Sequence, residues 1–187
     1  MTNQAAIVLT ALWVVWPAFG EGLAGTATTK EPVTIQLADQ WEKPANLRAP
    51  LAQVTVLTVA DRAGAAQIND WITPLKLQFG TNIQFFAVAD VSAVPGPLRG
   101  MVRRRFAKEY AYPIGLDWQG VVSGRLPIKP QAANLFLLDR NGHVQHSVKG
   151  SMEPPPLKAL TNVIAALLPA ARKPTALGRI AGRDEQP

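Results

Sequence analysis

The pattern of hydrophobic and polar positions predicts strands and helices in alternation from residue 33 to residue 168. Residues 53–60, QVTVLTVA, are apolar or β-branched at nearly every position, which is typical of a central strand covered on both faces. Residues 61–80 then carry apolar side chains at spacings of three and four, the period of an amphipathic helix. The side chains that we expect to face the sheet are Ile68, Trp71, Ile72, Leu75 and Phe79.

Both ends of this helix carry recognisable signals. Asp61 stands where a helix N-cap belongs, and Gly80 stands where a helix commonly stops. Pro74 falls inside the helix, where it removes one backbone hydrogen bond and bends the axis.

The remaining pattern supplies partners for this strand and helix. In chain order we expect a strand or hairpin (33–47), a second buried strand (83–90), a basic helix (98–110), a short strand (112–118), a hairpin centred on Asn141 and Gly142, and a closing helix (157–168). No regular element is expected between residues 119 and 133, which contain Gly124, Pro127 and Pro130. A strand, helix, strand order requires a parallel pair joined by a right-handed crossover, so the fold class is α/β with a mixed sheet.

Two phrases carry a resemblance to a known family. The strand and turn VTVLTVADRAGAAQIND and the hairpin LFLLDRNGHVQHSVKG, in this order of elements, resemble the thioredoxin superfamily and its exported thiol-reductase and peroxiredoxin-like branch. The resemblance covers residues 33–168. It implies a three-layer sandwich with a central mixed sheet, in which a parallel βαβ half is followed by a β-hairpin and a C-terminal helix.

The resemblance also shows what this chain lacks. It places the family's two redox cysteines at Ala63 and Ala66 and the family's cis-proline at Ala133, so all three positions are alanine. The whole chain contains no cysteine, which excludes thiol–disulfide oxidoreductase and cysteine peroxidase chemistry. It looks more like a cysteine-free exported subgroup, the YtfJ type, than like a working reductase.

Four charged residues remain as candidates for ligand binding: Asp61, Arg62, Asp90 and Arg105. Asp61 and Asp90 each follow a predicted parallel strand, so we expect them at the same sheet edge, where paired carboxylates bind metal or share a proton. The favoured alternative is that Asp61 caps its helix and Asp90 begins a loop. Arg105 falls within the apolar arc of its helix, where a guanidinium needs a partner such as Asp90 or Asp117.

Composition narrows the chemistry further. The 187 residues include 19 Lys and Arg against 13 Asp and Glu, a formal net charge of +6. Five of the cations lie between Arg99 and Lys108, but aromatic residues do not interleave with the cations on an exposed sheet, as base stacking requires, so nucleic acid is disfavoured. The two histidines, His143 and His146, are expected on opposite faces of a strand and cannot ligate one ion together. We expect His146 to be partly buried with its hydrogen bonds satisfied, and we expect no cofactor.

The two ends of the chain indicate its compartment. Residues 5–20 form an uncharged apolar run shorter than the roughly 20 residues of a spanning helix, which favours a signal peptide within residues 1–25. The location would then be periplasmic or secreted. The alternatives are an uncleaved membrane anchor or a buried core segment. If the chain contacts a membrane, we expect it to do so through this uncleaved segment. Residues 169–187 combine Pro, Gly and charge without periodicity and are expected to form a disordered basic tail.

Three functions are consistent with these features. The first is an exported, redox-inactive thioredoxin-fold protein without catalytic activity, which binds a protein partner or a small anionic ligand at the edge formed by residues 61–66, 90–97 and 127–133. The second is an enzyme that uses Asp61, Asp90 and Arg105 in acid–base or metal chemistry. The third is an electrostatic binder of membrane lipids or nucleic acid. Likeness of fold would also group the chain with thiol–disulfide or alkyl hydroperoxide reductases, whose thiol chemistry it cannot perform.

Overall fold

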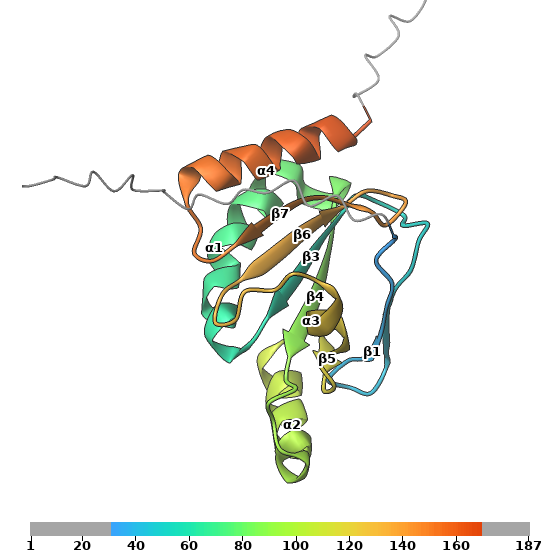
Figure 1. Ribbon diagram of the computed structural model, residues 1–187, viewed down its shortest axis with the longest axis vertical. Coiled ribbons are helices and arrows are strands. Elements are labelled where there is room, and N and C mark those ends of the chain that lie inside the picture. The colour runs from blue at the N-terminus through green and yellow to red at the C-terminus, as the bar shows by residue number, and fades with distance from the viewer. Residues whose placement is uncertain (1–30, 170–187) are drawn as a thin grey trace, which may run out of the picture.

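A five-stranded mixed sheet forms the centre of the computed structural model, which describes residues 31–169 (Figure 1). Its strands lie in the order β5 (Gly115–Asp117), β4 (Gln84–Asp90), β3 (Thr55–Ala60), β6 (Asn134–Leu138) and β7 (Val144–Lys149). β3, β4 and β5 are parallel, whereas β6 runs antiparallel to both β3 and β7. The predicted central strand is confirmed, because β3 lies mid-sheet and each of its six residues is buried.

Two long helices cover one face of the sheet (Figure 1). They are α1 (Arg62–Phe79), which is followed by a 3-10 turn (Gly80–Asn82), and α4 (Pro154–Leu167). All five side chains predicted to face the sheet belong to this core, with Trp71, Leu75 and Phe79 buried. The Trp71 indole Nε1 also donates to the Gly150 carbonyl at 2.9 Å, which ties α1 to the connection that leads into α4. Asp61 caps the helix and Gly80 ends it, as predicted.

A two-stranded hairpin and a short helix cover the opposite face. The hairpin pairs β1 (Ile35–Ala38) with β2 (Pro44–Leu47), and the helix is α3 (Val121–Arg125). The prediction that residues 119–133 hold no regular element is therefore wrong. The Asp117 carboxylate accepts hydrogen bonds from the amides of Val121 and Val122, at 2.9 and 2.8 Å, and this buried acceptor starts a helix that local propensity does not favour.

The basic helix α2 (Arg99–Glu109) protrudes at the lower end of Figure 1, after a 3-10 turn (Gly96–Leu98). None of its residues is buried. Val102 and Phe106 are its partly buried contacts, and they pack against Val91, Ile114 and Leu116. Strand β4 is mostly half-buried, with Val88 as its one buried residue, so the prediction of a fully buried second strand is also wrong.

The hairpin between β6 and β7 is confirmed, but its turn differs from the tight Asn-Gly turn that was expected. Gly142 N donates to Asp139 O at 3.0 Å, and Asn141 does not have a positive φ, so residues 140 and 141 are the central residues of the turn. Gly142 follows with φ +82, the left-handed position of a glycine bulge. The loop therefore has three residues, 140–142, whereas a tight Asn-Gly turn has two.

The predictions for a signal peptide or anchor and for a basic tail concern residues 1–30 and 170–187, which lie outside the described residues. Between residues 31 and 169, no helix combines the length and the apolar character that crossing a membrane requires.

Candidate functional site

The corner between β3 and α1, to which the resemblance assigns redox residues, is held closed by Asp61. One carboxylate oxygen of Asp61 accepts from the Gly64 amide at 2.8 Å, and the other accepts from the Gln131 amide at 2.7 Å. Gly64 belongs to the first turn of α1, whereas Gln131 belongs to the loop that leads into β6. Asp61 therefore both caps the helix and fastens this loop across the helix N-terminus.

The loop touches the helix directly. A Cβ added at Gly64 would lie 2.2 Å from the carbonyl oxygen of Ala132, so the two backbones meet with no room for a side chain. Gln67 adds two contacts, because its Oε1 accepts from the Ala133 amide at 3.2 Å and its Nε2 donates to the Gln131 carbonyl at 3.3 Å. The N-terminus of α1, a usual place for an anion, is covered by the chain itself.

The positions assigned to the lost redox residues lie around this contact. Ala63 and Ala66 are exposed on the first two turns of α1, next to the exposed Arg62, and Ala133 is fully buried at the start of β6. The cis peptide bond within residues 31–169 is Ala49–Pro50, so the bond that precedes Ala133 is trans. Asp61 caps the helix and anchors the loop, so its carboxylate occupies the N-terminus of α1.

Asp90 lies at the neighbouring strand end, because Ala60 and Ala89 pair in the parallel ladder of β3 and β4. Its carboxylate accepts from the amide and the hydroxyl of Ser92, at 3.1 and 2.6 Å, and so shapes the loop that follows β4. This is the loop-starting role that the sequence favours. Between residues 31 and 169, no group of three or more histidines, cysteines and carboxylates is placed to hold a metal ion.

Arg105 does not point inward, so the expectation that it pairs with Asp90 or Asp117 is wrong. Its side chain is 74% exposed, and Nε lies 3.5 Å from the Glu109 carboxylate one turn along α2. The Asp117 carboxylate is already occupied by the first turn of α3. Because α2 contacts the domain through a narrow stripe that contains Val102 and Phe106, the part of the apolar arc on which Arg105 was placed is left in solvent.

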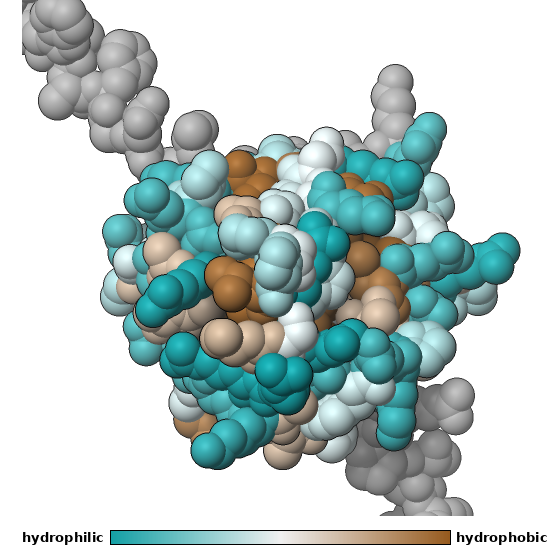
Figure 2. Space-filling view, turned by 90° about the horizontal axis from the view of Figure 1, so that it is seen from below, coloured by the Kyte–Doolittle hydropathy of each residue, from teal (hydrophilic) through white to brown (hydrophobic). Residues whose placement is uncertain are grey.

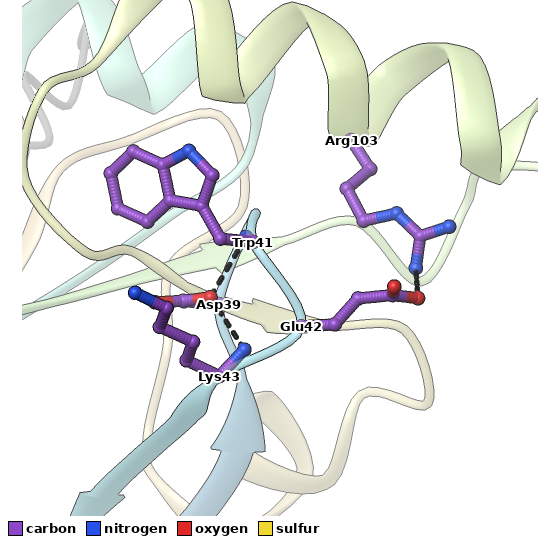
Figure 3. A network of polar contacts seen from close by, with 5 residues as sticks. All are labelled: Asp39, Trp41, Glu42, Lys43 and Arg103. Carbon is purple, nitrogen blue, oxygen red and sulfur yellow. Dashed lines mark hydrogen bonds and ion pairs between the residues drawn. The ribbon is translucent and has the colours of Figure 1, made fainter.

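Other cations of α2 also have local partners. Arg103 forms an ion pair with Glu42 at the tip of the β1–β2 hairpin (Figure 3). Arg99 stacks on the Trp118 ring, with 5.5 Å between its guanidinium carbon and the ring centroid. These contacts reduce the charge that the helix offers to a polyanion.

Hydrophobic side chains are exposed around this end of the molecule. Figure 2, which looks from below, shows brown hydrophobic surface between teal hydrophilic side chains. Large apolar residues that remain substantially exposed include Trp41, Leu98, Met101, Tyr112 and Val121. Apolar side chains exposed singly are common on protein surfaces, whereas a contiguous apolar patch is typical of a contact surface.

His146 is a second side chain, after Arg105, whose environment the sequence misjudged. It lies in β7 opposite Leu137 and is 4% exposed, and neither ring nitrogen has a hydrogen-bond partner within the described part of the chain. Burial lowers the pKa of His146 below its usual value. The prediction that His146 has its hydrogen bonds satisfied is therefore wrong. A register shift between β6 and β7 places Val144 on the opposite face of the sheet from His146. His143 lies in the turn, 3.8 Å from the Asp139 carboxylate.

A groove runs along β1, and the sequence gave no indication of it. Its first part, of about 1010 Å³, lies between residues 31–37 and the side formed by α3 and the residue after it, which contributes Val121, Val122, Arg125 and Leu126. Its second part, of about 540 Å³, continues from Gln36, Leu37 and Val121 toward Trp118. None of the sequence-predicted residues Asp61, Arg62, Asp90 and Arg105 lines either part.

Known proteins resemble this chain in fold. No family model and no curated protein matches it. A thiol:disulfide interchange protein DsbE from Chlorobium tepidum is 18% identical, with TM-score 0.54 over 78% of this chain and 100% of that chain. The exposed lipoprotein thioredoxin from Streptococcus pneumoniae is 14% identical, with TM-score 0.54 over 72% and 100%. Peroxidoxin BcpB from Mycobacterium tuberculosis is 20% identical, with TM-score 0.52 over 78% and 98%. The chain has a thioredoxin-like fold, as the sequence predicts, and it carries that fold without cysteine.

Proposed function

We propose that this chain is an exported thioredoxin-fold protein of the cysteine-free, YtfJ type, which acts by binding a partner protein and not by catalysis. The observation that carries the proposal is the closed corner. Asp61 uses both carboxylate oxygens inside the protein, and the backbone at Ala132 lies against Gly64. The fold thus retains its shape, while the place at which related folds perform chemistry is occupied by its own loop.

The same geometry favours a protein partner over a small anionic ligand. An anion at the N-terminus of α1 would compete with Asp61 for the Gly64 amide and would meet the Asp61 negative charge. The exposed apolar side chains at the lower end and the groove along β1 are instead suited to a macromolecule. The alternative of an enzyme built on Asp61, Asp90 and Arg105 gains no support, since Arg105 faces solvent.

Two observations support export: the apolar run at residues 5–20, and an exposed lipoprotein among the proteins of similar fold. The chain expressed in a bacterium is expected outside the cytoplasm, and deletion of residues 1–25 is expected to retain it inside. Cell fractionation reads out both forms. Cytoplasmic location of the intact chain would remove export from the proposal.

Binding is tested by placing a photo-crosslinking amino acid at single surface positions in the producing cell. Val121 in the groove and Arg104 on α2 are the informative positions, and the exposed Lys158 on α4 is the matched control. A discrete cross-linked protein at Val121 or Arg104, with none at Lys158, supports the proposal. Absence of any adduct at either position, or turnover of insulin disulfides or a hydroperoxide by the purified chain, contradicts it.

A further inference from the structure

The edge of β1 that lines the groove carries backbone groups with no hydrogen-bond partner within the described residues. Asp39 N donates to Lys43 O at 2.9 Å, which fixes the alternation of the antiparallel ladder between β1 and β2. Alternate residues therefore direct their N–H and C=O groups away from β2. In β1 these are Gln36 and Ala38, and Thr34 continues the same edge.

The other strand edges are protected against pairing, whereas this one is not. β2 begins with Pro44, which has no N–H to offer, β7 carries a register irregularity and ends with Lys149, and β5 is three residues long. From Val33 to Ala38 the chain reads VTIQLA, with neither a charge nor a proline. An unprotected edge is tolerated in a folded protein when it is recessed or when it has a partner.

The groove gives this edge the surroundings of a strand-binding site. β1 lies beside β5 and α3 (Figure 1), and the α3 side of the groove presents the apolar side chain of Val121, which is 40% exposed, above the buried Val122 and Leu126. A strand added to β1 would bond to the open backbone groups and would turn every second side chain toward this apolar wall.

Charge is balanced along the groove. The first part is lined by Glu31 and Arg125, and the second part by Glu42 and Arg99. Neither an acidic nor a basic partner is favoured, so recognition rests on the backbone and on apolar side chains. Binding is then expected to be nearly independent of salt, unlike binding to a membrane surface or a nucleic acid.

We propose that the groove between β1 and α3 binds an extended segment of a partner polypeptide, with apolar residues at alternate positions, as an additional strand on β1. The inference rests on the proposed binding function and names the kind of partner. It commits to a segment of another protein; the chain's own residues 1–30 or 170–187 and a second copy of the chain are competing occupants that the experiment separates.

The probe is a peptide selected on the full chain from a random library of about ten residues, the upper length of common strands. The selected peptide is resynthesised with N-methyl groups at its odd or at its even positions. Since only one edge of the bound strand faces β1, one of the two forms is expected to lose roughly fivefold in affinity for each bond removed, and the other to bind unchanged. No enrichment, or equal loss in both forms, overturns the proposal.

A matched pair of variants locates the site. Gln36 and Asn46 are cross-strand partners, and their N–H groups point to opposite edges of the hairpin. Gln36→Pro is expected to weaken binding of the peptide by about tenfold or more, whereas Asn46→Pro, which changes a residue of the second part of the groove but no N–H group of the β1 edge, is expected to weaken it much less. Equal effects overturn the proposal, provided that the two variants unfold at the same urea concentration.

Amide hydrogen exchange on the unmodified chain is the measurement that needs no variant. Peptide is expected to slow exchange at Gln36 and Ala38 and to leave Asn46 unchanged. Slow exchange at Gln36 and Ala38 before any peptide is added would mean that the chain's own ends fill the edge, or a second copy does if dilution reverses it, and either outcome overturns the proposal. If cross-links at Arg104 persist while the groove binds nothing, the binding function stands and this inference alone fails.

Discussion

Asp61 joins two segments that lie 70 residues apart, because its carboxylate also accepts from the Gln131 amide. The sequence predicted the local half of this role, since an aspartate before an amphipathic helix is a common cap. It gave no sign of the second half, which depends on how a loop without regular structure returns to the helix. Arg105 was wrongly predicted for a similar reason. A helical wheel placed it on the inward side of α2, but the width of the contact between α2 and the rest of the domain cannot be known from the helix alone.

The contact at Gly64 gives the first prediction at the residue scale. Gly64→Ala places a methyl group 2.2 Å from the Ala132 carbonyl oxygen, so the loop must move away from α1. We expect the free energy of unfolding to fall by about 1–3 kcal/mol, the usual cost of overpacking. Gly124→Ala is the control, because a Cβ there has nothing within 4 Å, and urea unfolding of both variants is the measurement. Equal stability of the two variants would show that the corner is open.

His146 gives the second prediction. The pKa of His146 is lowered in the folded state. Just below about pH 6.5 the His146 side chain is therefore protonated in the unfolded chain and still neutral in the folded chain. Stability is therefore expected to fall as the pH drops from about 6.5 toward the lowered value, and His146 has no effect above that window. Urea unfolding at several pH values should show a smaller loss in His146→Leu than in the unmodified chain. Parallel pH profiles for the two proteins would be evidence against a buried, unsatisfied ring.

At the scale of elements, two hairpins use the same turn with different residues. In each, an aspartate side chain accepts from the amides two and four residues later, and the residue between them that ends the turn has a positive φ. The turn after β1 is drawn in Figure 3. Its left-handed residue is Glu42, with φ 64, whereas the turn after β6 has Gly142. Asn141 and Gly142 are common turn residues and predicted the second turn from the sequence. The first turn gave no such signal, because a glutamate, Glu42, stands at its left-handed position.

This pair of turns gives a prediction with opposite signs. Gly142→Ala is expected to cost about 1–2 kcal/mol of unfolding free energy, because a side chain resists the left-handed conformation. Glu42→Gly, made together with Arg103→Ala to remove the ion pair from the comparison, is expected to gain about 1 kcal/mol over Arg103→Ala alone. Thermal or urea unfolding checks both changes. A loss of stability in both would mean that the two turns differ.

The elements themselves were predictable in proportion to their length and internal signals. α1 carries an apolar stripe of five residues, a cap and a stop, so its position follows from the sequence alone. α3 is five residues long and begins because of Asp117, a side chain outside the helix. The groove beside α3 escaped prediction for the same reason, since one of its walls was not expected to exist.

The whole molecule combines a closed corner between β3 and α1 with an open strand edge at β1. The fold is thioredoxin-like, and Asp61 and the Ala132 backbone close the corner between β3 and α1. On the opposite face of the sheet, β1 presents unpaired backbone groups beside the exposed side chain of Val121. The closed corner and the open strand edge together are the observations that support the proposed binding function.

Amide hydrogen exchange on the full chain without a partner tests this account most directly, because one data set reports on both places. The amides of Gly64, Gln131 and Ala133 are expected to exchange slowly, since they donate to Asp61 and Gln67. The amides of Gln36 and Ala38 are expected to exchange rapidly. Rapid exchange at Gly64 and Gln131 together with protection at Gln36 and Ala38 would describe an open corner and a filled edge, and would contradict the account.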